Sequence, residues 1–332
     1  MLDYKTYFPH YYNIKKHKHI PAYLKCKHIP VTFNENDSLK QLWRKHNRIL
    51  SKKEQELNCL PDQSLLDLKV TIATRLYSNC VFCNHRCRID RNKKIGQCHV
   101  KDTVISSAFL HWGEESFLVP SYAIFFSGCN LSCVFCQNYD ISQHITGRRL
   151  STTQLADSIN DQVSQKADNI NWVGGDPTPH LLFILKTLQQ LNTHLPQIWN
   201  SNMYCSPETM NLLNGIIDFY LTDFKFGSSI CAQQLSGIAD YVPIIQNNHI
   251  LASQQTDLLI RHLLIPNHIN CCTKPIIDFI SKSIPHRPVN IMDQYQPCYK
   301  AELFPSINRA ITAKEYKTAI SYAKQHNIIL IS

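Results

Sequence analysis

The chain has 332 residues, of which 44% are hydrophobic and 18% charged, enough to bury the core of one large domain with an attached module. The formal charge of +9 suits an anionic substrate, a nucleic acid or an acidic protein, but no long lysine tract concentrates it, so we interpret it as solvated surface and expect no nucleic-acid partner. The polar, Lys- and His-rich N-terminus and the lack of a long apolar run lead us to expect a cytoplasmic protein with no membrane partner.

Three regions are predicted along the chain. Residues 1–70 form an N-terminal helical arm, in which Ser38 to Leu57 carries apolar residues at helical spacing among Lys, Arg and Glu. Residues 71–118 form a small Cys-rich metal-binding module. Residues 119–332 form the core domain, because an alternation of strands and helices begins there.

Short apolar runs alternate with longer amphipathic segments through the core domain. We predict strands at 123–127, 169–173, 197–200, 219–221, 258–265, 289–292 and 328–331. We predict helices at 151–166, 179–191, 207–213, 229–236, 240–252, 274–283 and 312–325. The alternation favours an α/β fold with a parallel sheet, and about six repeats indicate a partial (β/α)6 barrel. Functional residues on such sheets lie at the carboxyl ends of the strands.

The first predicted strand of the core runs directly into a cysteine loop, Gly128 to Cys136, with the spacing C-x-x-x-C-x-x-C. In a reducing compartment, cysteines in such a loop bind metal more often than they form disulfides. Their thiolates suit an iron–sulfur cluster or zinc. Cys129, Cys133 and Cys136 would leave one iron of a [4Fe–4S] cubane open to a substrate amine and carboxylate. Phe135 is placed to pack on an adenine. The alternative from spacing alone is a zinc site with a remote fourth ligand.

A second motif, Gly174-Gly175-Asp176-Pro177, ends the next predicted strand. Glycines permit close backbone approach, and carbonyl groups exposed at a strand end can accept hydrogen bonds from a cationic amine. Alone, the motif is typical of an ordinary turn. One strand–helix unit after the cysteine loop, it is expected to face that loop across the mouth of the barrel.

The two motifs together resemble those of the radical S-adenosylmethionine superfamily. The resemblance implies a [4Fe–4S] cluster on the three cysteines of the loop, and S-adenosylmethionine (SAM) as cosubstrate. It also implies reductive cleavage of SAM to a 5′-deoxyadenosyl radical, with an electron donor such as flavodoxin or ferredoxin. Gly174, Gly175 and Asp176 would hold the methionyl amine.

Further segments are similar to the X-type homologues of pyruvate formate-lyase activating enzyme, over roughly residues 75–330. These segments are His111–Glu115, 124–142, 220–226, 261–266 and 290–297. The resemblance implies an oxidoreductase that acts on a protein, as glycyl-radical activating enzymes do. Gln294 and Tyr295 follow the sixth predicted strand of the core, where they line the substrate side or, for Tyr295, pack in the core.

The same resemblance assigns cofactor contacts to four residues on neighbouring strands. Asp223 and Lys225 match a D-x-K motif at the end of the fourth strand, with a structural ion pair as the alternative. Arg261 and His262 stand on the fifth strand. The resemblance also leads us to expect a glycine near Met203, which this sequence lacks.

Cys80, Cys83, Cys87 and Cys98, here called the upstream set, lie in a segment too short for a core of its own. Four thiolates suit a structural zinc site or a second [4Fe–4S] cluster that relays electrons, and both alternatives stay open. We expect His85 to be a surface residue. The other cysteines have no motif spacing and are expected to be mostly small buried apolar residues: Cys26, Cys59, Cys205, Cys231, Cys271, Cys272 and Cys298.

Three functions follow from these patterns. The first is a radical enzyme that acts on a protein backbone, and the second is the same core acting on a nucleic acid or a small molecule. The third is a non-catalytic zinc-binding scaffold. The order of the cysteine loop, the Gly-Gly-Asp-Pro motif and the D-x-K motif along the chain disfavours the third.

Overall fold

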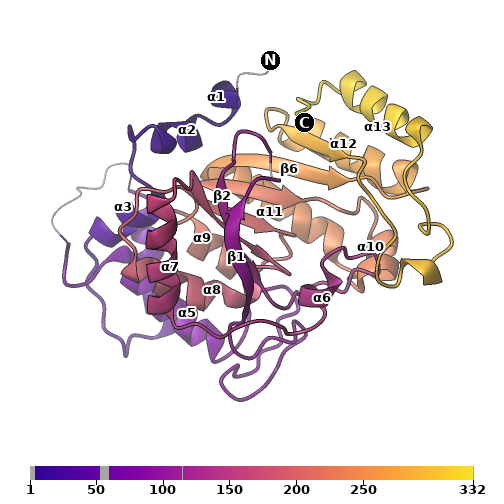
Figure 1. Cartoon of the computed structure of the whole chain (residues 1–332). Helices are drawn as coiled ribbons and strands as arrows, with labels where there is room; N and C mark the ends of the chain where they lie inside the picture. Colours follow the sequence, from indigo (N-terminus) through magenta and orange to yellow (C-terminus); the bar gives the residue numbers. More distant parts are fainter. Residues whose placement is uncertain (1–3, 53–59, 114, 332) are drawn as a thin grey trace.

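A computed structural model describes residues 4–52, 60–113 and 115–331. Its centre is a seven-stranded sheet whose strands lie side by side in chain order (Figure 1). The first strand is antiparallel to the second, and all later neighbours are parallel. The strands are β1 (Ile105–His111), β2 (Ser121–Phe126), β3 (Asn169–Gly174), β4 (Gln197–Ser201), β5 (Phe219–Asp223), β6 (Asp257–Leu263) and β7 (Val289–Met292).

The six parallel strands confirm the predicted α/β class and the partial (β/α)6 barrel. Central strands of such a sheet are covered on both faces, so their residues are buried, polar ones included. Every residue of β4 is buried, and Trp172 and Trp199 pair in register with no exposed surface. The register also aligns the strand ends, since Phe126 pairs with Gly174 and Asp223 with Arg261. Polar residues that follow the strands therefore meet at one edge.

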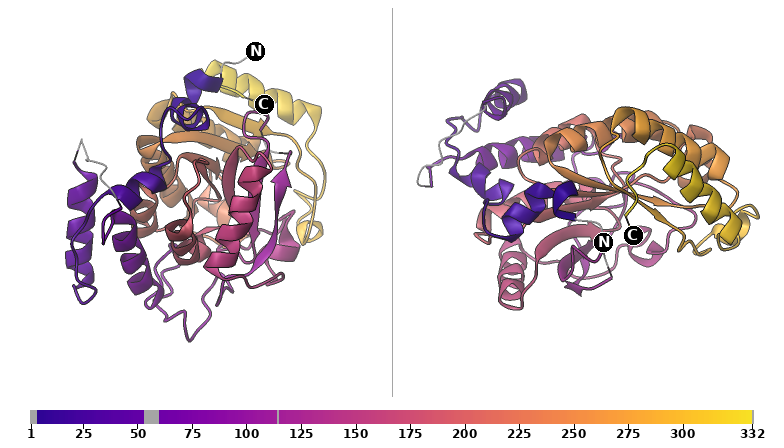
Figure 2. Two further views of the ribbon diagram at one scale, coloured as in Figure 1. Left: turned by 60° about the vertical axis from the view of Figure 1, so that its left-hand side comes forward. Right: turned by 90° about the horizontal axis from the view of Figure 1, so that it is seen from above.

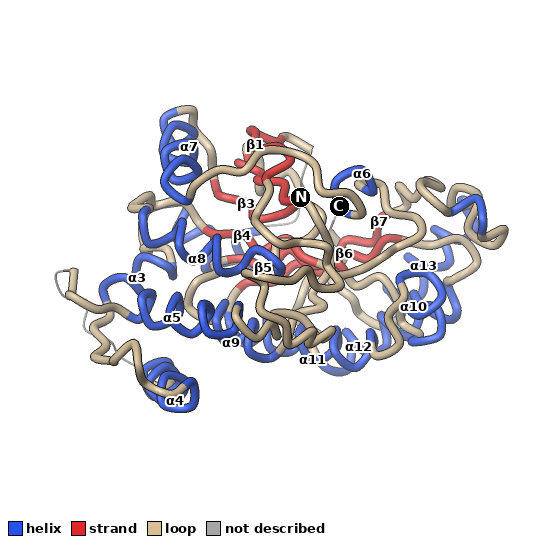
Figure 3. The backbone as a smooth tube through the Cα atoms, turned by 90° about the horizontal axis from the view of Figure 1, so that it is seen from below, coloured by secondary structure: helices blue, strands red, loops and turns tan. Residues whose placement is uncertain are grey.

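Crossover helices cover the outer face of the curved sheet, as the views in Figures 2 and 3 show. Several begin with a capping box, as at Ser151 with Gln154 and at Thr312 with Glu315. The core helices are α6 (Tyr139–Ser142), α7 (Thr152–Ser164), α8 (Leu181–Gln190), α9 (Pro207–Leu213), α10 (Ser229–Ser236), α11 (Tyr241–Gln255), α12 (Lys274–Ser283) and α13 (Ala313–Gln325). Short turns are the 3-10 helices η1 (Thr178–His180) and η3 (Ala301–Leu303) and the π-helix η2 (Ile269–Thr273).

The N-terminal segment closes the barrel at the amino ends of the strands. Its helices are α1 (Tyr4–Tyr7), α2 (Pro9–Lys15), α3 (Ala22–His28), α4 (Leu39–Leu50) and α5 (Leu65–Tyr77). Phe8 is fully buried and packs edge-on against Phe219 of β5, with ring centroids 5.0 Å apart. The backbone N–H of Tyr11 donates to the Asp257 carboxylate at 2.8 Å, at the start of β6. The arm thus leaves the opposite end, where the strands finish, open for a site.

Three differences from the sequence predictions concern elements at the margins. Strand β1 was not predicted, because after Ile105 its residues are half-buried or exposed at a sheet edge and include few β-branched side chains. The strand predicted at 328–331 is a single bridge between Val289 and Leu330. The helix predicted from Ser38 to Leu57 is α4, which ends at Leu50, and residues 53–59 lie outside the described residues.

The predicted division into 1–70, 71–118 and 119–332 stays a prediction. Helix α5 runs across residue 70, and β1 lies within 71–118 while pairing with β2. Over the part of the chain that the structure describes, every helix is too short or too polar to cross a bilayer.

Candidate functional site

A cavity of about 270 Å³ lies at the carboxyl ends of the strands. It collects side chains from the loop after β2 and from the ends of β3, β4, β5 and β6. Apart from His262 and the upstream set, all of the residues predicted to hold the cluster or the cosubstrate line it: Cys129, Cys133, Phe135, Cys136, Gly174, Gly175, Asp176, Asp223, Lys225 and Arg261. Residues separated by up to 132 positions in the sequence therefore share one space.

The cysteine loop places three unpaired thiols on one wall of this cavity. Cys133 is buried, whereas Cys129 and Cys136 are half-buried. The Cys129 sulfur accepts hydrogen bonds from the Leu131 backbone N–H at 3.3 Å and the Asn202 amide at 3.5 Å. Such bonds stabilise a thiolate and tune the potential of an iron–sulfur cluster.

The chemistry of these thiols suits a cationic metal centre. Burial raises the pKa of Cys133 to about 12. Burial, reinforced by the neighbouring Asp176 carboxylate, raises the pKa of Cys129 well above its ordinary value. Without a metal both side chains therefore keep their protons near neutral pH. A metal that replaces the protons supplies the positive charge that the thiolates need.

The spacing of the sulfur atoms separates two kinds of metal site. Tetrahedral zinc with Zn–S bonds near 2.3 Å brings its sulfur ligands to within about 3.8 Å of one another. Over the described residues, only Cys231, His268 and Cys271 bring three ligand atoms within 4.8 Å of one another. The sulfurs of the cysteine loop and of the upstream set are spread more widely, as expected for thiolates bound to separate irons of a cluster.

The two glycines after β3 are required by close backbone contacts. A Cβ on Gly174, which has φ of +121°, would lie 2.1 Å from the Phe126 nitrogen. A Cβ on Gly175 would lie 2.1 Å from the Gly128 carbonyl oxygen at the start of the cysteine loop. The Asp176 N–H donates to that same carbonyl at 3.0 Å. The motif and the loop are therefore in direct contact, as the sequence predicted.

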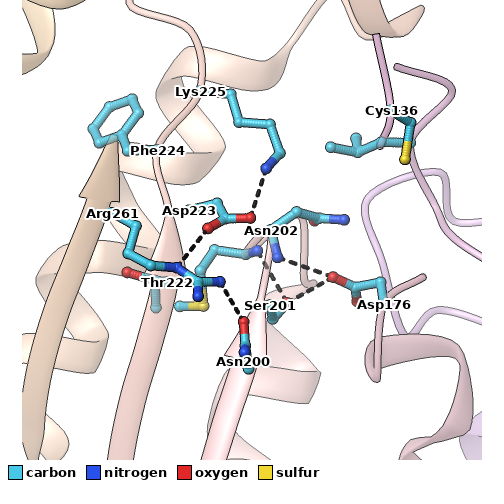
Figure 4. A network of polar contacts seen from close by, with 12 residues as sticks. Cys136, Asp176, Asn200, Ser201, Asn202, Thr222, Asp223, Phe224, Lys225 and Arg261 are labelled. Atoms are coloured by element: carbon cyan, nitrogen blue, oxygen red, sulfur yellow. Dashed lines mark hydrogen bonds and ion pairs between the residues drawn. The ribbon is translucent and has the colours of Figure 1, made fainter. Parts of the chain in front are cut away.

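Asp176 is buried, and its hydrogen bonds join the ends of β3 and β4 (Figure 4). Its carboxylate accepts hydrogen bonds from the Thr178 N–H, the Ser201 hydroxyl and the Asn202 N–H, each at 2.9 Å. Asn202 in turn donates to Asn130 of the cysteine loop at 2.8 Å. That Asp176 holds the methionyl amine stays a prediction; its contacts show that it fixes the shape of this wall of the cavity.

Asp223, Lys225 and Arg261 form a charged cluster on the wall opposite Cys136 (Figure 4). The Asp223 carboxylate accepts from the Lys225 ammonium at 2.6 Å and from Arg261 Nε at 3.0 Å. Burial alone would raise the pKa of Asp223, but the two cations lower it to about 2. Arg261 also donates to the Asn200 side chain at 2.6 Å. The cluster carries a net positive charge into the cavity.

Two of the remaining predicted residues lie away from the open cavity. His262 neighbours Arg261 but faces the other side of β6, where its ring nitrogens bond to the Phe224 carbonyl at 2.7 Å and the Thr273 hydroxyl at 2.9 Å. Tyr295 is buried and its hydroxyl donates to the Ile307 carbonyl, so it packs in the core.

Phe135 and Gln294 do line the cavity. Phe135 is 4% exposed and lies against Phe226 and Tyr295, with centroids 6.0 and 5.7 Å away. Phe135 thus contributes an aromatic ring to the cavity wall next to Cys136.

Met203 lies in the turn after β4, near which the sequence analysis expected a glycine. Its φ is +61°, a left-handed conformation that glycine adopts without strain. The backbone is held by the Ser201 hydroxyl, which accepts from the Met203 N–H at 3.0 Å, and by Asn248, which donates to the Met203 carbonyl at 2.8 Å. The chain therefore keeps a glycine-like turn after β4 with a methionine.

The upstream set is docked against the cysteine loop. His85, expected at the surface, hydrogen-bonds through Nε2 to the Asn130 carbonyl at 2.8 Å. The buried Arg91 donates to the Pro179 carbonyl at 2.5 Å, beside the Gly-Gly-Asp-Pro motif. The Cys98 carbonyl oxygen would lie 3.1 Å from a Cβ on Gly128. The segment that carries the upstream set is thus in direct contact with the cysteine loop and with the turn after the glycine motif.

The four thiols of the upstream set face a shared interior. Cys80, Cys83 and Cys98 are each less than 9% exposed, and Cys87 is half-buried. Burial raises the pKa of Cys83 well above its ordinary value, and the other three thiols raise it further. None of the four lines the cavity. This enclosure fits a closed metal centre.

Sequence reasoning missed the polar residues that surround the predicted ones. Asn200 and Ser201 end β4, Asn202 follows it, and all three line the cavity, as do Ser142 and Gln143 beside Cys136. The Ser142 hydroxyl lies 3.2 Å from the Cys136 sulfur. A signal was present, because a polar Asn-Ser-Asn run at the carboxyl end of a buried strand is typical of a site residue.

A family model described as the Radical SAM superfamily matches residues 123–280. The uncharacterized protein MJ0674 of Methanocaldococcus jannaschii is 45% identical over 317 residues, which cover 92% of this chain and 94% of that protein. The similarity to this relative therefore extends well beyond the region of the family model.

Among solved structures, methylornithine synthase (PylB) is 15% identical with a TM-score of 0.46, covering 97% of this chain and 78% of that one. A domain of pyruvate-formate lyase-activating enzyme from Bacteroides vulgatus is 14% identical with a TM-score of 0.38, covering 49% of this chain and 97% of that one. Neither likeness bears on the substrate.

Proposed function

The chain belongs to the radical SAM superfamily, and from this premise we propose that it cleaves SAM reductively at the cavity described above. Cys129, Cys133 and Cys136 would hold a [4Fe–4S] cluster with one iron open to the cosubstrate. The observation that carries the proposal is convergence. Three thiols, two glycines and a cationic cluster from four separate parts of the chain line one cavity.

A bound cluster of this kind supplies an electron to the sulfonium of SAM, which releases methionine and a 5′-deoxyadenosyl radical. The residues of this chain bind and orient the cosubstrate. Lys225 donates one of its three N–H groups to Asp223, which leaves the others for the methionyl carboxylate. Gly174 and Gly175 also line the cavity, where their backbone would bind the methionyl amine.

Other residues would shape the rest of the site. Phe135 would offer an apolar surface for the adenine, because it lines the cavity next to Cys136. Leu263 and Met292 line the cavity from β6 and β7, where they limit the access of water to a reactive radical. His262 is not included, because its contacts fix it to the outer side of β6.

The test is formation of 5′-deoxyadenosine by anaerobically reconstituted protein with SAM and a strong reductant. The wild-type chain is expected to form the product, and the variant with Cys129, Cys133 and Cys136 all changed to Ala is expected to form none. A matched control is Cys298→Ser, a half-buried cysteine outside the cavity. Continued cleavage by the triple variant would remove the proposal.

The finer function that we propose is that of an X-type activating enzyme homologue, an oxidoreductase acting on a protein substrate in the cytoplasm. It is supported by the ordered segments at 111–115, 124–142, 220–226, 261–266 and 290–297. Flavodoxin or ferredoxin would supply the electron. Anoxic pull-down with the reconstituted chain as bait tests it, and recovery of a nucleic acid or a small molecule in place of a protein would overturn it.

For the upstream set we propose a second [4Fe–4S] cluster that passes electrons to the first. Two observations support it over zinc. No three of the four sulfurs lie within 4.8 Å of one another, and His85 hydrogen-bonds to the cysteine loop directly. Metal analysis of variants in the upstream set distinguishes the two metals.

A further inference from the structure

Cys231, His268 and Cys271 meet at the carboxyl end of the barrel, outside the cavity. Cys231 lies in the first turn of α10, which follows β5. His268 and Cys271 lie at and within the π-helix η2, which follows β6. Their spacing in the sequence gave no motif, and Cys231 and Cys271 were expected to be apolar packing residues. The fold brings them together across 40 positions.

The geometry of the three ligand atoms matches one small metal ion. All three lie within 4.8 Å of one another, and the sulfurs of Cys231 and Cys271 are 3.6 Å apart. Two sulfurs on tetrahedral zinc, each bonded at about 2.3 Å, lie about 3.8 Å apart. The compact group therefore differs from the cysteine loop and the upstream set, whose sulfurs are more widely spread.

His268 is oriented as a metal-binding histidine. One ring nitrogen, Nδ1, donates to the Pro266 carbonyl at 2.6 Å, which fixes the tautomer and leaves the lone pair on Nε2. A backbone carbonyl in this role is the usual partner of a zinc-bound imidazole. Asn267, directly before it, has φ of +63°, and the π-helix that follows is a rare conformation found most often at functional sites.

Burial and charge fit a cation in this position. Cys231 and His268 are 8% and 9% exposed, whereas Cys271 is half-buried, so an ion has a route in from solvent. Two thiolates and a neutral imidazole balance the two charges of Zn²⁺. Cys272 is buried beside the pair and is the next thiol within reach.

We propose that Cys231, His268 and Cys271 bind one zinc ion that fastens α10 to the turn after β6. This link also affects the cysteine loop. At the other end of α10, the carbonyls of Leu235 and Ser236 accept hydrogen bonds from the Val134 and Ser132 N–H groups at 2.9 and 3.2 Å. The zinc ion therefore fixes the first turn of α10. The last turn of α10 supports the cysteine loop through these two hydrogen bonds.

The first experiment uses the wild-type, iron-reconstituted chain under anoxia and follows alkylation of individual cysteines by mass spectrometry. One equivalent of zinc chloride is expected to slow alkylation of Cys271 by about tenfold or more, because a metal-bound thiolate is a poorer nucleophile. Cys298, also half-buried, serves as the internal control and is expected to react at an unchanged rate. Equal rates for Cys271 with zinc and with EDTA would overturn the site.

The second experiment counts zinc and iron in Cys231→Ser/Cys271→Ser and in His268→Gln, with Cys298→Ser as the matched control. Both site variants are expected to lose about one zinc per chain with iron unchanged, whatever metal the upstream set holds. Because zinc content does not depend on SAM cleavage, failure here is distinct from failure of the proposed function. Unchanged zinc in both variants, or a Cys231–Cys271 disulfide in zinc-free wild type, contradicts the proposal.

Discussion

The cysteine loop and the upstream set both gather thiols beside the barrel, but their surroundings differ. The three thiols of the loop line the cavity, together with the cationic side chains of Lys225 and Arg261. Of the four thiols of the upstream set, three are buried and Cys87 is half-buried, and none reaches that cavity. Three ligands next to an open cavity suit a centre that binds a substrate, whereas four enclosed ligands suit a centre that only folds the module or carries electrons.

The contrast also shows how the chain couples two centres. The links between the regions run through backbone carbonyls, from His85 to Asn130 and from Arg91 to Pro179. Each link ends at or near a motif of the candidate site. The module is therefore part of the wall that supports the loop and its glycine motif.

The largest expected effect follows from removing the upstream set. The variant with Cys80, Cys83, Cys87 and Cys98 all changed to Ala should lose about four irons per chain if the centre is a cluster, or about one zinc if it is structural. The segment between these residues has no core of its own, so we expect faster proteolysis within residues 79–100. Metal analysis and limited proteolysis measure both, and an unchanged metal content would show that the set binds none.

A single methyl group should disturb the contact between the glycine motif and the cysteine loop. Gly175→Ala places a Cβ 2.1 Å from the Gly128 carbonyl, so we expect a loss of about 1–3 kcal/mol in the free energy of unfolding and strongly reduced SAM cleavage. The matched control is Gly215→Ala, where the new Cβ meets only ordinary contacts and the strain comes from φ of +78°. Equal cleavage by both variants would mean that the motif does not set the loop geometry.

The ion pairs of the cavity should contribute to cosubstrate binding more than to stability. Asp223→Asn and Lys225→Met each remove one charge from the buried cluster, where a charged hydrogen bond contributes about 1.5–3 kcal/mol. The dissociation constant for SAM should therefore rise roughly ten- to a hundredfold, with iron content unchanged. Calorimetric titration checks this against Lys186→Met, an exposed lysine on α8. A lower melting temperature with unchanged affinity would favour the purely structural ion pair.

The smallest effect concerns the surface link between module and barrel. Arg86 forms a bidentate, partly exposed pair with Glu208 at 3.0 and 2.9 Å, which is worth about 0.5–1 kcal/mol. Arg86→Met should lower the melting temperature slightly. Arg91→Met should lower it much more, because Arg91 is 1% exposed and its loss leaves buried carbonyls without donors. Similar shifts for both variants would contradict the view that the module is held by its buried contacts.

The sequence predicted the parts of the site whose members lie close together along the chain. The cysteine loop and the glycine motif are each contiguous, so residue type and spacing were sufficient. Asn202 was missed because its contact with Cys129 spans 73 positions and depends on how β4 aligns with β2. The zinc ligands proposed at Cys231 and Cys271 were missed for the same reason.

One error could have been avoided from the sequence alone. Arg261 and His262 were both assigned to the cofactor, but successive residues of a strand point to opposite faces. Since Asp223 pairs in register with Arg261, the cavity side belongs to Arg261 and the helix side to His262. The elements at the margins of the fold were harder to predict. Strand β1, for example, lies at the edge of the sheet, where it pairs with β2.

The most direct test of the central claim is electron paramagnetic resonance of the reduced, reconstituted chain with and without SAM. If Cys129, Cys133 and Cys136 hold a cluster whose fourth iron faces the cavity, SAM must change the signal of one cluster by coordinating that iron. The signal of the upstream set, with four protein ligands, must stay the same. A spectrum that SAM leaves unchanged, or a chain that takes up zinc and no iron at the cysteine loop, would contradict the account.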